Sequence, residues 1–279
     1  MEKPFNKIQL DCQAMYQVDL SKLEDLEYDD EAHAKIRLIG ERYRVQGSRY
    51  LVSLPTHATE KLALFLGLFY GDGSLVNFES AARNGSWRID FTEGDEEVVR
   101  LFAKLGKEIF NVDFKVQYRK TWYAAYVRSK IVYRFLSKIC GHPTGRKTGK
   151  LLFPEVLMFS NTCCEFLKGI FSTEGTVYLC NKNQPRIALT MQEEKLMNEI
   201  YEKLVTLGFR PTRSVETKGE RKLYKISLYG QEQAKLFKEK IGFMGAKRRK
   251  LEELLFCRET LNKTVIYSSV KINACSPVG

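Results

Sequence analysis

The amino-acid sequence predicts an α+β fold built from two similar units. Two observations support this prediction. An apolar segment that ends in a carboxylate and a glycine occurs twice, and the residues after each copy follow the same order of strand and helix patterns. Each unit reads helix, strand, strand, helix, strand, strand, helix. A repeated order of this kind indicates a duplicated structural unit.

The repeated segment predicts a buried helix with an acid at its end. It spans Phe65–Gly73 in the first copy and Leu167–Gly175 in the second, so that Asp72 and Glu174 stand 102 residues apart. An acid at the tip of an apolar helix is costly to bury unless it has a partner. Two acids at matched positions therefore indicate one shared site.

The remaining elements of the first unit follow from periodicity. Alternating apolar and polar residues predict strands, and apolar residues at helical spacing, such as Val98, Phe102 and Leu105, predict a long helix. After Asp72 the sequence predicts strands over 74–78 and 86–92, a helix over 95–110, strands over 112–119 and 122–128, and a short helix over 131–139.

The second unit repeats this order after Glu174. Leu196, Ile200 and Leu204 have the spacing of one helix face. The sequence predicts strands over 176–180 and 185–190, a helix over 193–209, strands over 213–217 and 222–229, and a short helix over 233–241.

Small residues in the two motif helices predict close packing between them. Gly67 and Gly71 lie four residues apart on one helix face, and Gly169 and Thr173 occupy the matching positions. Small residues at this spacing let two helix backbones approach closely. Ordinary packing glycines would give the same pattern, and both interpretations bring the two acids together.

Two adjacent carboxylates favour a bound cation. Asp72 and Glu174 would repel each other and would also face the negative ends of two helix dipoles. A hard divalent cation relieves this repulsion, and Mg²⁺ suits carboxylate, water and phosphate oxygens. Next to a phosphodiester, such a metal activates water and neutralises charge on the leaving oxygen.

These repeats resemble the LAGLIDADG homing endonucleases in their single-chain form with two motifs. The resemblance covers about residues 56–243. It implies two pseudo-symmetric αββαββα repeats packed through their motif helices, with two antiparallel sheets forming a saddle on DNA. It further implies a monomeric, Mg²⁺-dependent enzyme of intron homing that cuts both strands of a long asymmetric target, in which Mn²⁺ substitutes and Ca²⁺ binds without supporting cleavage. The metal site would comprise Asp72, Glu174, Gly71 and Thr173.

The same resemblance implies polar residues around the metal. Glu93 follows the second strand of the first unit, where many relatives carry Gln, so its role is open. Met191 or Gln192 takes the matching place in the second unit, and we favour Gln192. Lys130, at the start of a short helix, would stabilise phosphate charge, although a solvated lysine explains it equally well.

Polar residues on the groove side of each sheet are the expected DNA contacts. In the second strand Trp87, Ile89 and Phe91 should face the helices, which leaves the alternate residues to DNA. Each expected contact could instead touch phosphate or only solvent. The expected set is Arg88, Asp90, Lys115, Gln117, Arg119, Lys182, Arg186, Lys225 and Ser227.

Composition agrees with a polyanionic partner. The chain has 45 Lys and Arg against 34 Asp and Glu, a formal charge of +11, which favours nucleic acid. It lacks an apolar run long enough to cross a membrane and an N-terminal signal segment. Its seven cysteines show no zinc-site spacing, so we expect a reduced, intracellular protein that is not secreted.

The segments outside the repeats are less informative. We expect an extension over 1–55, repeats over 56–140 and 162–243, a basic linker over 141–161 that crosses the DNA backbone, and a helix and tail over 244–279. The extension includes a possible short helix over 20–28 and alternating strands over 34–54, and it is either a DNA-contacting arm or a packed subdomain. The helix should follow the basic run Lys247–Lys250. Because the chain lacks the terminal residues of an intein, we expect a free-standing protein.

Three functions remain open on the sequence. They are a site-specific DNA endonuclease, a non-cleaving DNA-binding regulator of the same fold, and a maturase that binds intron RNA. The two intact carboxylates favour the first over the second, because a protein that only binds DNA gains nothing from them.

Overall fold

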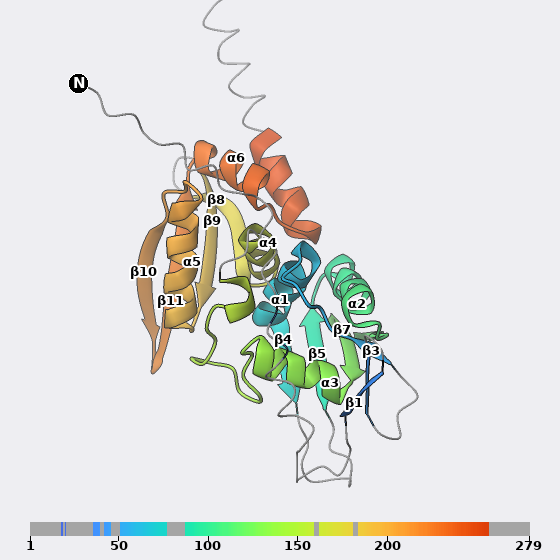
Figure 1. The fold of residues 1–279 in the computed structure, drawn as a ribbon. Coiled ribbons are helices and arrows are strands. Elements are labelled where there is room, and N and C mark those ends of the chain that lie inside the picture. The colour runs from blue at the N-terminus through green and yellow to red at the C-terminus, as the bar shows by residue number, and fades with distance from the viewer. Residues whose placement is uncertain are drawn as a thin grey trace, which may run out of the picture.

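The predicted α+β architecture is confirmed by a computed structural model. The structure describes residues 18, 20, 36–39, 42–45, 51–76, 87–158, 162–180 and 184–256. Within these residues, two four-stranded antiparallel sheets flank a central pair of helices, α1 (Glu60–Asp72) and α4 (Cys163–Glu174) (Figure 1).

The first unit places its sheet in the order β4-β5-β7-β6. Its helix α2 begins after Asp95, whose side chain accepts a hydrogen bond from the backbone N–H of Glu97 and so caps the helix. The short helix predicted over 131–139 starts as an α-helix and ends as a π-helix. The elements after α1 are β4 (Gly73–Val76), β5 (Arg88–Glu93), α2 (Glu96–Phe110), β6 (Lys115–Arg119), β7 (Trp122–Arg128), α3 (Lys130–Arg134) and the π-helix Phe135–Ile139.

The second unit has the corresponding strand order β10-β11-β9-β8. In Figure 1, α5 lies over this sheet and α6 near its end, and a helix over 245–256 follows (red). The elements after α4 are β8 (Gly175–Cys180), β9 (Gln184–Met191), α5 (Glu194–Thr206), β10 (Thr212–Lys218), β11 (Arg221–Tyr229) and α6 (Gln231–Lys240).

Helices α1 and α4 touch through their backbones, as the small residues predicted. A Cβ atom added at Gly169 would lie 2.5 Å from the backbone N of Leu68 and 2.7 Å from the carbonyl O of Leu64. Likewise, a Cβ atom added at Gly71 would collide with the side chain of Thr173. The glycines are therefore required by the contact between the two units and not only by local packing.

The apolar face predicted for each sheet is packed against the helices. Ile89 and Phe91 of β5 are fully buried, and the ring of Phe91 stacks on that of Phe102 in α2 at 4.3 Å between centroids. Ile187 and Leu189 occupy the corresponding buried positions of β9. The core therefore runs from one unit to the other through the central helix pair.

Two predictions outside the repeats have clear outcomes. The alternation over 34–54 corresponds to a three-stranded sheet, β1 (Ile36–Ile39), β2 (Arg42–Val45) and β3 (Val52–Ser53). The C-terminal helix begins at residue 245, so the expectation that it follows the basic run was wrong. The suggested helix over 20–28 lies almost wholly outside the described residues. Across the described part of the chain, every helix is too short or too polar to cross a membrane.

Candidate active site at the tips of the paired helices

Each motif helix passes directly from its acid into a strand. Asp72 is the last residue of α1, and β4 begins at Gly73, whose N–H donates to the carbonyl O of Phe69. A side chain at Gly73 would collide with the ring of Phe69. The glycine after the acid therefore lets the strand leave the helix without a loop, which fixes Asp72 at the junction of helix and sheet.

The carboxyl group of Asp72 lies in a crowded acidic environment. Burial raises its pKa to about 7, with further contributions from a side-chain hydrogen bond with Glu93 and from the nearby charges of Glu174 and Glu93. Lys147 opposes these effects. The carboxyl group of Asp72 therefore keeps its proton to a much higher pH than an exposed aspartate does.

Glu174 is the counterpart of Asp72 in the second unit. Burial raises its pKa, the charges of Lys147 and Lys247 lower it, and those of Glu193 and Glu93 raise it. The two motif acids, predicted to meet, are therefore close enough to interact electrostatically. This juxtaposition is the feature that the matched sequence positions indicated.

Two partly buried lysines cap the two motif helices in equivalent ways. The Nζ atom of Lys147 donates to the backbone carbonyls of Tyr70 at 3.2 Å, Gly73 at 3.1 Å, and Gly71. The carbonyls of Tyr70 and Gly71 belong to the last turn of α1, where carbonyls lack a partner within the helix, and a cation here also interacts favourably with the helix dipole.

Lys247 does the same for α4. Its Nζ atom donates to the carbonyl O of Ser172 at 2.6 Å and to that of Thr173. Burial lowers the pKa of both Lys147 and Lys247, while the surrounding acids, Asp72 and Glu174 among them, raise it. The site therefore contains two acids and two cations related by the same pseudo-symmetry as the helices.

The donor set fits a hard divalent cation. Two desolvated carboxylates and the carbonyl oxygens of Gly71 and Thr173 are all oxygen ligands, and both carbonyls already accept from a cationic ammonium group. No cluster of three His, Cys, Asp or Glu ligands occurs among the residues that the structure describes. Any metal here would therefore complete its coordination with water or phosphate oxygens, as Mg²⁺ commonly does.

Lys130 lies away from these acids, contrary to the expectation. It is buried at the start of α3, and its Nζ atom lies 5.3 Å from the centre of the Trp87 ring. Trp87 lies just before the first residue of β5, whereas Glu93, which contacts Asp72, is the last residue of this strand. About 20 Å of extended strand therefore separates Trp87 from Glu93. The reason is topological: β7 runs antiparallel to β5 and delivers Lys130 to the far end of the sheet.

The register of the second sheet corrects the match of Glu93 to Gln192. Gly73 pairs with Phe91 in the first unit, and Gly175 pairs with Leu189 in the second. Phe91 and Leu189 are therefore equivalent positions, and two residues after each of them Glu93 corresponds to Met191. Met191 is buried, and Gln192 falls one position later.

The expected DNA-facing residues of the first unit lie on one face of its sheet. Arg88 and Asp90 are partly exposed and form an ion pair of 2.6 Å, so each neutralises the other in the free protein. Lys115, Gln117 and Arg119 occupy alternate positions of the edge strand β6. The side-chain amide oxygen of Gln117 accepts from the guanidinium of Arg119 at 3.0 Å.

In the second unit the expected set is partly corrected. Ser227 is buried, because the guanidinium of Arg186 covers it and donates to its hydroxyl oxygen at 2.8 Å. Arg186 also lies over the ring of Tyr229 at 4.6 Å. Lys225 pairs with Glu216 at 3.5 Å, and Lys182 lies outside the described residues. At this place on the sheet, Arg186 and not Ser227 is therefore the residue available for a DNA contact.

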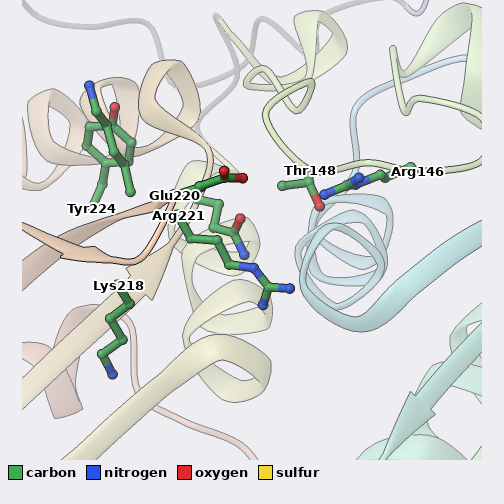
Figure 2. Close-up of a pocket in the computed structure, with 8 residues that line it drawn as sticks. Arg146, Thr148, Lys218, Glu220, Arg221 and Tyr224 are labelled. Carbon is green, nitrogen blue, oxygen red and sulfur yellow. The ribbon is translucent and has the colours of Figure 1, made fainter.

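A basic cavity of about 640 Å³ separates the linker from the β10–β11 hairpin. Figure 2 shows Arg146 and Thr148 on one side of it and hairpin residues on the other. Its lining comprises Arg146, Thr148, Gln192, Lys218, Glu220, Arg221, Lys222 and Tyr224. Four cations against one carboxylate make this surface suitable for a phosphate backbone.

Sequence reasoning missed Lys147 and Lys247, although a signal was present. Gly141 is followed after three residues by Gly145 and then by Lys147, and a similar run leads from Gly242 to Lys247 with one residue fewer. The duplication thus extends beyond the last helix of each unit. The segment predicted to be a linker therefore supplies a residue of the site.

Comparison with protein families identifies both halves separately. Residues 61–148 match the family model described as the WhiA LAGLIDADG-like domain, and residues 161–242 match the model of the LAGLIDADG-like domain.

Among curated proteins the similarity is to parts of larger chains. The chain is 27% identical over 212 residues to a replication factor C small subunit of Methanocaldococcus jannaschii, a match covering 74% of this chain and 11% of that protein. It is 28% identical over 194 residues to a subunit of the A-type ATP synthase of Pyrococcus abyssi, covering 68% of this chain and 18% of the relative. A replicative DNA helicase DnaB of Rhodothermus marinus matches at 26% identity over 71% of this chain and 22% of its own length.

Solved structures share the fold. The crystal structure of I-DmoI with DNA and Ca matches with a TM-score of 0.52 at 21% identity, covering 70% of this chain and 97% of that chain. The LAGLIDADG homing endonuclease I-GzeII in complex with its DNA target matches with a TM-score of 0.52 at 12% identity, covering 73% and 91%. With both halves matched and the two-motif fold in place, the chain belongs to the LAGLIDADG family, in its single-chain form with two motifs.

Proposed function

We propose that this protein is a divalent-metal-dependent endonuclease that cleaves both strands of double-stranded DNA at a specific, long and asymmetric site. The observation that carries the proposal is the pairing of one acid and one partly buried lysine at the end of each motif helix, Asp72 with Lys147 and Glu174 with Lys247. A protein that only binds DNA has no use for two acids whose burial is costly. Two equivalent sets of groups suit two equivalent reactions, one on each strand.

Asp72 and Glu174 would hold the cation, together with the carbonyl oxygens of Gly71 and Thr173. When bound, the metal supplies a lowered pKa for its water and charge neutralisation at the phosphate. Asp72 must be ionised before its carboxylate can act as a ligand, and a bound cation would favour the ionised form. Glu93 interacts with Asp72 through a side-chain hydrogen bond and would help to orient its carboxyl group.

Lys147 and Lys247 would stabilise negative charge on the phosphate oxygens. Both ammonium groups are largely removed from water, which strengthens their interaction with a developing charge. Their hydrogen bonds to backbone carbonyls hold them in place before the DNA arrives. This preorganisation favours the transition state over the ground state.

The sheets and the basic cavity would bind the DNA. A charge of +11 and the cations around the cavity support a phosphate-contacting surface that extends from the active site over the second unit. The structural neighbours that share the fold are described as complexes with DNA, one with Ca and another with Mn. These descriptions favour a DNA substrate and a divalent cation for this chain, and none of them names RNA, which the third hypothesis required.

The curated relatives support a mobile module. The chain spans 11%, 18% and 22% of three proteins with unrelated names, so the shared segment is a small part of each. A segment that recurs within different host proteins is expected of a homing endonuclease, which spreads by inserting its own coding sequence.

A second candidate is a DNA-binding protein of the same fold that does not cleave. The match of residues 61–148 to the WhiA LAGLIDADG-like domain favours it. The two candidates differ in one measurable property, which is cutting of bound DNA in the presence of Mg²⁺ or Mn²⁺.

The test begins by selecting bound duplexes from a randomised DNA library in Ca²⁺. The selected duplexes are then incubated with Mg²⁺ or Mn²⁺. We expect the wild type to cut both strands, and Asp72→Asn and Glu174→Gln to bind in Ca²⁺ without cutting. Asp113→Asn is a matched control, because this acid is highly exposed and pairs only with Lys107 on the surface. Binding by the wild type without cleavage in either metal would establish the second candidate.

A further inference from the structure

The cation at the tip of α4 comes from outside the second unit. Lys247 belongs to the helix over 245–256, which follows the last helix of that unit. The backbone N–H of Met244 donates to the Ser172 hydroxyl oxygen at 2.9 Å and helps to dock this segment on α4. We call residues 243–249 the C-terminal strap.

The strap is anchored on the opposite unit. The N–H of Ala246, the residue before Lys247, donates to Oδ2 of Asp95 at 2.6 Å. Asp95 is the N-cap of α2 in the first unit, where its Oδ1 accepts from the N–H of Glu97 at 2.9 Å. Arg249 adds an ion pair of 2.8 Å with Glu97.

The approach of the strap to Asp95 requires a glycine. Gly245 has φ of +55°, and a Cβ atom there would lie 2.9 Å from both Cγ of Asp95 and Cγ2 of Val98. The backbone of the strap therefore packs directly against the side chains of Asp95 and Val98, in contrast to surface ion pairs between long side chains, which contribute little.

A related contact occurs beside Lys147. Glu193 corresponds in register to Asp95, and its Oε1 accepts from the N–H of Gly149 at 3.3 Å. Gly149 lies two residues after Lys147, whereas Ala246 lies one residue before Lys247, so the two bonds differ in position and length. In both cases the backbone next to the lysine bonds to an acid of the opposite unit.

We propose that Asp95 is a positioning residue for Lys247, and that each unit thereby holds in place the lysine of the other. The proposal rests on the proposed function for its effect on cleavage, but the anchoring itself can be tested in the free protein. Loss of the Ala246 bond would loosen Lys247 while leaving Asp72 and Glu174 in place. Cleavage of the strand that Lys247 serves should then slow more than cleavage of the other.

Three substitutions separate positioning from helix capping. Asp95→Asn keeps a good N-cap but puts an amide donor where the Ala246 N–H needs an acceptor. Asp95→Glu weakens the cap but keeps a carboxylate acceptor, as Glu193 does naturally without capping α5. Glu96→Gln is the control, because it makes the same change of charge in the same helical turn and its partner is Arg100, not the strap.

The first measurement is amide hydrogen exchange over residues 243–249 in the DNA-free protein. We expect faster exchange in Asp95→Asn, and protection close to wild type in Asp95→Glu and Glu96→Gln. Gly245→Ala, whose new Cβ atom would collide with Asp95 and Val98, should displace the strap and resemble Asp95→Asn. Unchanged protection in both Asp95→Asn and Gly245→Ala would overturn the proposal.

The second measurement is single-turnover cleavage of each labelled strand at saturating protein. We expect Asp95→Asn to slow one strand about tenfold, Asp95→Glu to restore it, and Lys247→Met to abolish any further effect of Asp95→Asn. Equal slowing of both strands, or additive effects with Lys247→Met, would assign Asp95 a purely structural role. If the wild type cuts no DNA, the proposed function fails, and the exchange experiment still decides the anchoring.

Discussion

The backbone contact between α1 and α4 makes a quantitative prediction for Gly169→Ala. The new Cβ atom would lie 2.5 Å from the N of Leu68 and 2.7 Å from both the C of Gly67 and the O of Leu64. Ordinary van der Waals contact begins near 3.4 Å. The helices must therefore separate by somewhat less than about 1 Å, and none of the three atoms can move away by rotating a side chain.

Two opposing effects determine how much Gly169→Ala changes the free energy of unfolding. Replacing glycine by alanine inside a helix is favourable by about 1 kcal/mol. Forcing a methyl group into a packed interface typically costs about 1–3 kcal/mol, and rigid backbone neighbours place this site at or beyond the upper end. We expect a net loss of about 2 kcal/mol, which corresponds to a fall of roughly 3–4 °C in the melting temperature of a 279-residue protein.

The measurement is thermal and urea unfolding of Gly169→Ala beside Gly94→Ala. Gly94 has open space around its missing side chain and an ordinary φ, so its substitution should be close to neutral. A melting temperature of Gly169→Ala equal to or above that of the wild type would show that the helices do not touch, and would remove the structural basis for bringing Asp72 and Glu174 together.

Three further predictions follow from the site. With chelator present, the free energy of unfolding should fall as pH rises from about 4 to above 7, because the pKa of Asp72 is raised from 3.8 to about 7 in the folded protein, which therefore binds the extra proton in that range. In urea unfolding at pH 5 and pH 8, we expect Asp72→Asn to be more stable than the wild type at pH 8 only. An equal gain at both pH values would contradict the raised pKa. DNA binding should weaken steeply with salt and involve one chain per duplex, as checked by titrations at several salt concentrations and by sedimentation of the complex; two chains per duplex would disprove the single-chain site. Lys130→Met should lower the stability of the protein and leave the single-turnover cleavage rate unchanged, since Lys130 packs over Trp87 at the far end of β5. A cleavage rate reduced about 100-fold would instead show that Lys130 has the catalytic role expected from the sequence.

The sequence predicted the architecture because each unit is locally consistent. A strand is indicated by the alternation around Ile89 and Phe91, and a helix by the spacing of Val98 and Phe102. The duplication provided an independent copy of every element. The pairing of Asp72 with Glu174 followed from the glycines, since small residues at matched positions specify where two helices meet.

The errors arose where the answer depends on strand pairing or on distant segments. Lys130 follows a strand end, and only the antiparallel register shows that this is the end opposite the acids. Gln192 and Met191 differ by one residue, which periodicity cannot resolve but pairing does. Lys147 and Lys247 reach the site from outside the predicted units, and the glycine spacing that the two segments share does not by itself show that they lie beside the acids.

The direct backbone contact of α1 with α4 also sets the distance between the two sheets. Each sheet begins directly at the end of its motif helix, without an intervening loop, so the separation of the helices fixes the separation of the sheets. On the proposed function, that spacing sets how far apart along the duplex the two strands are cut. The stagger of the cut ends would then be determined by two glycines that never approach the DNA, and it should remain constant when the groove-facing residues are changed to alter the target.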